Sequence, residues 1–266
     1  MKLLDWVPLE KLDWRGLSMN PNAIELLEKN LDKVDWFQLL WNPNAIHLLK
    51  KNPWNIKWDI LSYNPNAMNL LEANPEKIDW DILSCNPSAI HLLEKNPWNI
   101  KWQWLSMNPG AIHMLEANPE KICWRALSKN PNAIHMLEAN PEKICWDNLS
   151  RNPSAIHFIE KNLDKVHWFQ LLWNPAAIHL IEANPKKIVW DILSENTNAI
   201  QLLEKNAERI DFLRLSRNPS IFVDDRQALS KERVETLREE LMERTWHPER
   251  FRSWCLEHDD EFYLEV

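Results

Sequence analysis

The chain has 266 residues, of which 45% are hydrophobic, so it can bury one large core or two small ones. Two glycines stand beside 17 prolines and 17 tryptophans, and so few glycines disfavour tight β-turns and phosphate-cradling loops, which use residues that accept positive φ. The net charge of −8 argues against a general nucleic-acid binder, whose affinity comes mostly from neutralising phosphates.

The first segment, residues 1–13, resembles half of a repeat that begins an array, because LEKLD before Trp14 parallels PEKID before Trp80. Its opening, MKLLDWVPLE, has acids and no continuous apolar run, which is not typical of an export signal. No later stretch has the length and apolarity of a membrane span. Cys123 and Cys145 lie one repeat apart, about 8–10 Å in packed helices, which is beyond disulfide reach. An intracellular protein with reduced thiols is expected.

Residues 14–223 contain nine full repeats of 22 residues and a partial tenth, in which Phe212 takes the place of tryptophan. The repeated tryptophans are Trp14, Trp36, Trp58, Trp80, Trp102, Trp124, Trp146, Trp168 and Trp190. A first asparagine series is Asn20, Asn42, Asn64, Asn86, Asn108, Asn130, Asn152, Asn174, Asn196 and Asn218. A second series is Asn30, Asn52, Asn74, Asn96, Asn118, Asn140, Asn162, Asn184 and Asn206.

The unit reads W-x-x-L-S-x-N-P-x-A-I-x-L-L-E-x-N-P-x-K-I-x. Asparagine caps the free N–H groups of a starting helix, and proline at the first helical position lacks the N–H that would be unpaired. The two asparagine-proline steps therefore predict two short helices in each unit, both capped by Asn side chains. The second, around Trp80 in its unit, is short enough to be α or 3₁₀.

Helices of this length are not stable alone, so each unit must cover the apolar face of the next. The sequence predicts an all-α fold, an α-solenoid of tandem two-helix repeats whose tryptophans supply most of the bulk between layers. At about 8–10 Å for each layer, the expected shape is a rod several times longer than wide.

Residues 224–266 leave the repeat pattern and contain 7 basic and 13 acidic residues. Residues 230–244 have the spacing of an amphipathic helix, and a shorter helix is expected after His247-Pro248. This segment is predicted to be an acidic helical cap over the apolar face of the last repeat.

The pattern LSxNPxAIxLLExNPxKIxW, followed by WHPERFRSWC, resembles repeat proteins encoded by large DNA viruses of algae and amoebae. The NPNA-x-x-x-LL stretch is also similar to leucine-rich-variant solenoids, which pair an α-helix with a 3₁₀ helix, although the regular tryptophan departs from that family. The resemblance implies the solenoid fold, a viral source and a location in the host cytoplasm or the virion. It implies no functional residues.

Three further columns recur. Histidines one repeat apart cannot share a metal ion, because a zinc ligand must approach to about 2.0–2.1 Å, so a partly exposed row bonded to an adjacent Glu or Asn is expected, with a pH response as a secondary hypothesis. These are His47, His91, His113, His135, His157 and His179. A Glu column and a Lys column are interpreted as paired surface ladders. The Asn series are interpreted as structural.

Positions that vary between repeats are free to carry recognition. The residue before the first Asn is Met, aromatic or Cys in the early repeats and mostly charged in the later ones. Exposed aromatic residues and Met are typical of interface hot spots, although these side chains could equally fill gaps between layers. The candidate partner-binding residues are Trp41, Tyr63, Met107, Trp54, Trp98 and Trp104.

No catalytic, cofactor or metal motif is present, and the acidic run at 258–261 is interpreted as a solvated terminus. The sequence therefore predicts a non-enzymatic scaffold or adaptor that binds a protein partner along one face, outside membranes. A structural part of a virion or a self-assembling spacer is the alternative. Base-by-base RNA binding is the less favoured third hypothesis because the repeats are near neutral. The partner and the oligomeric state are left open.

Overall fold

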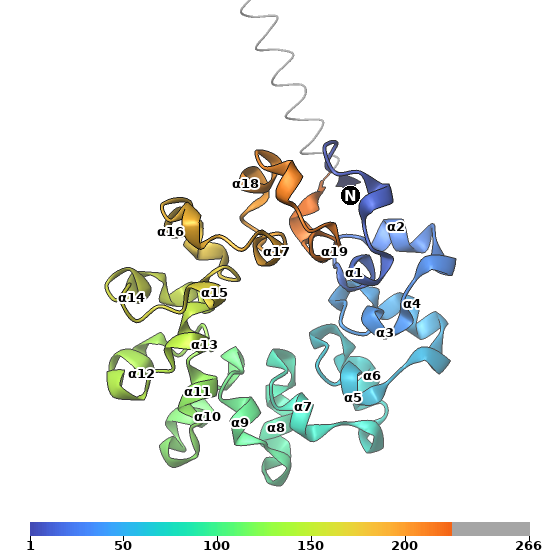
Figure 1. Cartoon of the computed structure of the whole chain (residues 1–266). Helices are drawn as coiled ribbons and strands as arrows, with labels where there is room; N and C mark the ends of the chain where they lie inside the picture. Colours follow the sequence, from blue (N-terminus) through green and yellow to red (C-terminus); the bar gives the residue numbers. More distant parts are fainter. Residues whose placement is uncertain (225–266) are drawn as a thin grey trace, which may run out of the picture. The chain divides into compact units, whose positions relative to one another are not determined.

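Each repeat folds into two short α-helices joined by 3₁₀ turns, in a computed structural model that describes residues 1–224. The inner helices begin at the repeated tryptophan and lie toward the centre of the arrangement in Figure 1. They are α1 (Trp14–Met19), α3 (Trp36–Leu39), α5 (Trp58–Leu61), α7 (Trp80–Leu83), α9 (Trp102–Leu105), α11 (Trp124–Leu127), α13 (Trp146–Ser150), α15 (Trp168–Leu171), α17 (Trp190–Leu193) and α19 (Phe212–Leu215).

The outer helices carry the Ile-x-Leu-Leu-Glu part of the repeat and lie around the outside (Figure 1). They are α2 (Ile24–Glu28), α4 (Ile46–Lys51), α6 (Met68–Glu72), α8 (Ile90–Lys95), α10 (Ile112–Glu116), α12 (Ile134–Glu138), α14 (Ile156–Glu160), α16 (Ile178–Glu182) and α18 (Ile200–Glu204).

Most asparagine steps begin a 3₁₀ turn, and the second helix of each unit, left open between α and 3₁₀, is a short α-helix that in most repeats follows such a turn. The turns that precede outer helices or end the array are η3 (Pro43–Ala45), η5 (Pro65–Ala67), η7 (Pro87–Ala89), η9 (Pro109–Ala111), η12 (Pro153–Ala155), η13 (Pro175–Ala177) and η16 (Pro219–Ile221). Those that precede inner helices are η1 (Leu9–Lys11), η2 (Leu31–Lys33), η4 (Pro53–Asn55), η6 (Pro75–Lys77), η8 (Pro97–Asn99), η10 (Pro119–Lys121), η11 (Pro141–Lys143), η14 (Pro185–Lys187) and η15 (Ala207–Arg209).

The first asparagine series joins neighbouring repeats as well as capping turns. In each of its ten members, the side-chain Oδ1 accepts the backbone N–H two residues later, as Asn130 does from Asn132 at 3.0 Å. Its Nδ2 donates to two backbone carbonyls of the preceding repeat; for Asn130 these belong to Ser106 and Asn108, at 3.1 and 2.9 Å. All ten side chains are buried, so the bonds between repeats form away from water.

The prediction that the second series also caps the following turn is wrong. Each of these side chains donates backward, to the carbonyl four residues earlier, as Asn118 does to Met114 at 2.9 Å. None caps the turn that follows. The outer helix ends with unpaired carbonyls, and these Asn side chains satisfy one of them.

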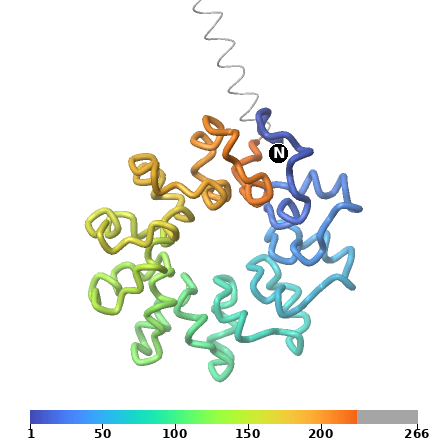
Figure 2. Tube along the Cα trace, viewed as in Figure 1, coloured from blue at the N-terminus to red at the C-terminus, as the bar shows by residue number. Residues whose placement is uncertain are grey.

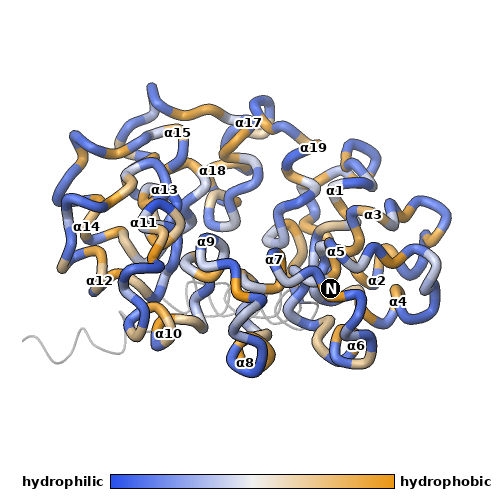
Figure 3. Tube along the Cα trace, turned by 90° about the horizontal axis from the view of Figure 1, so that it is seen from below, coloured by the Kyte–Doolittle hydropathy of each residue, from blue (hydrophilic) through white to orange (hydrophobic). Residues whose placement is uncertain are grey.

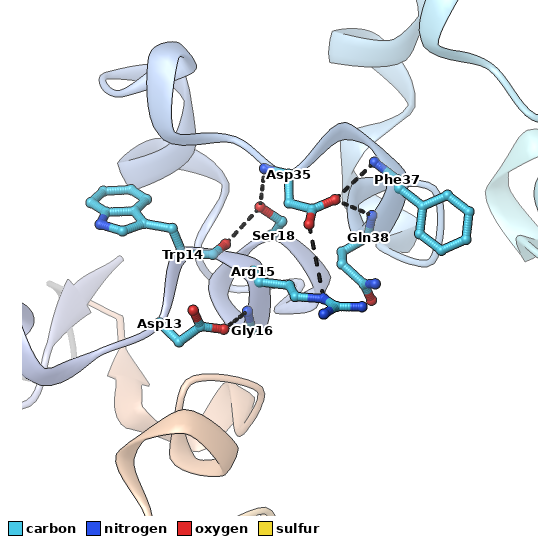
Figure 4. A network of polar contacts seen from close by, with 8 residues as sticks. All are labelled: Asp13, Trp14, Arg15, Gly16, Ser18, Asp35, Phe37 and Gln38. Carbon is cyan, nitrogen blue, oxygen red and sulfur yellow. Dashed lines mark hydrogen bonds and ion pairs between the residues drawn. The ribbon is translucent and has the colours of Figure 1, made fainter.

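A serine near the end of most inner helices makes a second link between layers. Ser18 donates to the Trp14 carbonyl at 2.8 Å and accepts the N–H of Asp35, which directly precedes α3 of the next repeat, at 3.0 Å (Figure 4). The Asp35 carboxylate in turn caps α3 by accepting from the N–H groups of Phe37 and Gln38, both at 3.0 Å. This network fixes where each inner helix starts relative to its neighbour.

The core between layers is built from leucine and alanine more than from tryptophan, which corrects the expected role of the indoles. The repeated leucine and alanine, such as Leu105 and Ala111, are 0% exposed. The nine tryptophans that recur every 22 residues are all half-buried. A cation stacks on most of them, as the Lys187 Nζ does at 3.8 Å from the Trp168 ring centroid. Along the trace, short hydrophobic stretches alternate with hydrophilic ones (Figure 3).

The array closes on itself within the unit Leu4–Phe222, where the tenth repeat packs against the first (Figures 1 and 2). Asn20 of the first repeat donates to the carbonyls of Ser216 and Asn218, both at 3.0 Å. The N–H of Asp13 donates to the Ser216 Oγ at 2.7 Å. The asparagine links join every other pair of layers in the same way and the serine link joins most of them, so this unit is a ring of ten repeats.

The tenth repeat is assembled from two parts of the chain. Residues 212–222 supply its first half, and the segment 4–13 supplies the second, where Lys11 stacks on Phe212 at 5.0 Å as repeat lysines do on tryptophan. The junction with the first repeat is tight: a Cβ on Gly16 would meet the Ser216 Cβ at 2.7 Å and the Leu213 carbonyl oxygen at 3.1 Å. Glycine suits that place because α1 and α19 approach closely.

The expected extended rod is therefore wrong, although the all-α repeat solenoid itself is confirmed. The predicted cap at 224–266 lies outside the described residues, except for Asp224. Two short strands, β1 (Lys2–Leu3) and β2 (Phe222–Val223), form a two-stranded sheet. Among residues 1–224, no helix is both long and apolar enough to cross a membrane.

Candidate functional site

The exposed face of the inner helices carries the residues that vary most between repeats. The residue after each tryptophan is exposed in all ten repeats. The residue that precedes the first Asn of the repeat lies four positions later, as Trp41 lies after Phe37. Side chains four positions apart share one face of a helix. The column after the tryptophan is Arg15, Phe37, Asp59, Asp81, Gln103, Arg125, Asp147, Phe169, Asp191 and Leu213.

Side chains on this face meet across repeats. The rings of Trp41 and Tyr63, one repeat apart, have centroids 5.2 Å apart and are tilted by 57°. The Arg214 guanidinium reaches past a whole repeat to lie 5.8 Å from the Trp173 ring centroid. Such a reach requires a concave surface, because side chains on the convex side of a ring diverge. We call this concave surface the inner face.

The inner face carries large aromatic residues along one arc, in repeats two to five, beside the exposed Asp59 and Asp81. Trp41 is 37% exposed, Tyr63 45% and Trp104 39%, whereas Met107 is half-buried. Phe37, 51% exposed, belongs to the same arc. We call Phe37, Trp41, Tyr63 and Trp104 the aromatic arc.

Four of the six predicted partner-binding residues thus come from inner helices or the residues just after them, and two do not. Trp54 and Trp98 lie in the 3₁₀ turns η4 and η8 and are 76% and 95% exposed. Each turn also has an asparagine, Asn55 or Asn99, at the position where most repeats have a lysine. In those repeats the lysine stacks on the repeated tryptophan, as Lys77 does on Trp58. Reasoning from the sequence missed Phe37, although the variable column after each tryptophan was a signal for it.

Between the aromatic side chains, Cys85 is buried against the Ile82 carbonyl, 3.1 Å from its sulfur. Burial raises the pKa of the Cys85 thiol to about 11, against a smaller opposing effect of its backbone hydrogen bond. Burial, and then the neighbouring Cys85, raise the pKa of Tyr63 above its ordinary value. Both groups therefore stay neutral at physiological pH.

The opposite arc is cationic, with Arg151 and Arg214 on either side of Trp173, at 4.9 and 5.8 Å from its ring. Glu195 lies in the same group, 3.8 Å from Arg214. Burial is the main cause that raises the pKa of Glu195, and the nearby arginines oppose it.

The histidine column lies on the outer helices and pairs with glutamate, as expected. His113 Nε2 lies 2.8 Å from Glu94 Oε1 in the preceding repeat, and four more such pairs join consecutive outer helices. The expected pairing of the Glu column with the Lys column is wrong, because five of the eight glutamates pair with histidine and most of the lysines stack on tryptophan. Within residues 1–224, no group of three or more His, Cys, Asp or Glu side chains could hold a metal ion.

The described chain is thus a closed α-solenoid, a repeat ring with a chemically divided inner face. Comparison with protein-family models finds no match, and neither curated proteins nor solved structures match the chain. The inner face must therefore be interpreted from its own chemistry.

Proposed function

We propose that the ring is a non-enzymatic protein-binding scaffold, which holds a partner protein on its inner face through the aromatic arc. The observation that carries the proposal is the grouping of large, partly exposed aromatic residues, which include the contacting pair Trp41 and Tyr63. Aromatic residues of this kind dominate the binding energy of protein interfaces.

The backbone beneath the arc supports the same proposal. Asn42 and Asn64, which stand directly after Trp41 and Tyr63, are each held by two inter-repeat hydrogen bonds. A surface fixed in this way loses little conformational entropy when it binds, and such preorganisation increases affinity. The partner remains to be found by experiment.

Affinity capture from cell lysate with the Trp41→Ala/Tyr63→Ala double variant tests the proposal. We expect the captured partner to be reduced by about tenfold or more, the effect of losing a hot-spot pair. The matched control is Trp54→Ala/Trp98→Ala, which removes two more exposed aromatic residues outside the inner helices and is expected to leave capture unchanged.

Equal capture by the wild type and the Trp41/Tyr63 variant would contradict the assignment of this face. If the ring captures nothing and is instead abundant in purified virus particles, the structural role would replace the scaffold role.

A further inference from the structure

Five residues of the cationic arc form a compact group, which we call the arginine cluster: Arg151, Trp173, Glu195, Arg214 and Arg217. They come from four consecutive repeats, the seventh to the tenth. Arg151 and Arg214 both stack near Trp173, with their Cζ atoms 4.9 and 5.8 Å from the ring centroid. The curvature of the ring brings guanidinium groups from distant repeats onto one indole.

The charges of the cluster do not balance. Three guanidinium groups face one carboxylate, and the ion pair within the cluster joins Arg214 Nη1 to Glu195 Oε2 at 3.8 Å, a long separation. The Glu195 Oε2 and the Arg217 Nε are buried and have no hydrogen-bond partner. Buried polar atoms are normally paired, so Arg217 retains an unused donor within the cluster.

We propose that the arginine cluster binds the carboxylate side chains of an acidic peptide segment, which belongs to the partner held by the inner face. This assignment rests on the proposed scaffold function and adds the chemistry of the partner. Guanidinium groups match carboxylates through paired N–H donors. The Trp173 ring, already bordered by two arginines, offers an apolar surface to the methylene groups of the same segment.

A short acidic peptide fits the cluster better than a nucleic-acid strand. A strand needs a continuous basic path, because every phosphate along it carries a charge. The inner helices interrupt such a path with Asp147 and Asp191, both exposed and both within the arc that holds the arginines. Positive charge is therefore concentrated at one place, which suits a short run of carboxylates.

Fluorescence anisotropy with a labelled oligoglutamate peptide tests the assignment on the full chain. We expect the wild type to bind this peptide and the Arg151→Gln/Arg217→Gln double variant to bind it at least about tenfold more weakly, as for the loss of buried charge pairs. Arg209→Gln is the matched control: this arginine also stacks on a tryptophan, Trp190 at 5.3 Å, but lies outside the cluster. Its removal is expected to leave peptide affinity unchanged.

Three comparisons make the test specific. An oligolysine peptide should not bind, and an RNA oligonucleotide that binds more tightly than oligoglutamate would overturn the assignment in favour of a nucleic acid. A phosphoserine peptide of the same length distinguishes phosphate from carboxylate as the preferred group. If the glutamine variant does not fold, Arg151→Lys/Arg217→Lys keeps the charge and should still weaken binding, because an ammonium lacks the guanidinium fork.

The outcome is separable from that of the scaffold proposal. Suppose that lysate capture still depends on Trp41 and Tyr63. If the wild type then does not bind the peptide, or if the cluster and control variants lose the same affinity, the arginine site alone is overturned. Loss of that dependence, with peptide binding intact, would overturn the aromatic arc and leave the arginine site standing.

Discussion

At the scale of single residues, the first asparagine series holds the ring together because no other side chain as short can make its three bonds. The Asn130 Oδ1 accepts one backbone N–H, and its Nδ2 donates to two carbonyls of the preceding repeat. Aspartate has no donor for the two carbonyls, and serine has a single O–H. The requirement for a donor group and an acceptor on one short side chain accounts for the ten repeated asparagines.

The neighbouring Asn132 provides a test of this account. It also donates to the preceding repeat, to the Pro109 carbonyl at 2.9 Å, but its bond is exposed. We expect Asn130→Ala to lower the free energy of unfolding by about 2–4 kcal/mol, since it loses a cap and two buried hydrogen bonds to the preceding repeat. Asn132→Ala should cost less than about 1 kcal/mol. Urea unfolding measures both, and equal losses would contradict the special role of the buried rung.

At the scale of elements, consecutive outer helices are joined by charged groups at the surface. Glu160 at the end of α14 lies 2.8 Å from His179 of α16 and 3.5 Å from His157 of its own helix. The hydrogen bond from His179 is the main cause that lowers the pKa of Glu160, and His157 contributes less. Because the pKa is lowered by folding, the contact stabilises the folded state above the ordinary pKa of glutamate, and this contribution is lost as the pH falls through the lowered value.

Removal of the two histidines should therefore have unequal effects on the Glu160 carboxylate. We expect His179→Ala to raise the pKa of Glu160 toward its ordinary value and His157→Ala to raise it by less, since His179 is the larger cause. A pH titration of the Glu160 carboxyl carbon by NMR measures the shift. The reverse order would show that the contact within α14 outweighs the contact between helices.

At the scale of the whole ring, every layer has two neighbours, whereas an open solenoid has two end layers with one each. The Asn20 side chain donates to two carbonyls of the tenth repeat, both at 3.0 Å. The Asn130 side chain donates to the two equivalent carbonyls of the fifth repeat. The closing junction is thus equivalent in its bonds to an interior one.

Closure predicts that Asn20→Ala and Asn130→Ala lower the free energy of unfolding by similar amounts, within about 1 kcal/mol of each other. In an open array, Asn20 would have no repeat before it and would lose only its cap. A markedly smaller cost for Asn20→Ala in urea unfolding would therefore show that the array is open in solution.

Much of this architecture can be predicted from the sequence, because it depends on local chemistry. The period, the asparagine starts and the α and 3₁₀ mixture follow from residues such as Asn42 and Pro43, whose conformational preferences act within a few positions. The closure could not be predicted in that way, since it depends on small angles between layers that add up over ten repeats. Its one signal was that half a repeat at 1–13 complements the partial repeat from Phe212.

The candidate site could be predicted only in part for the same reason. Variability between repeats pointed to Trp41 and Tyr63, which are exposed. The arginine cluster was not evident, because Arg151 and Arg214 are far apart in the chain and meet at Trp173 only when the array is curved.

The split tenth repeat has a consequence for how such a gene can change. The stretches at 30–43 and 162–175 are nearly the same, which indicates that units have been copied within the array. An open array simply lengthens when a unit is copied. Here an eleventh unit would separate Asn20 from the Ser216 carbonyl to which it donates. We therefore expect a copy that adds a unit to destabilise the ring, and a copy that replaces one unit by another to leave the closure intact.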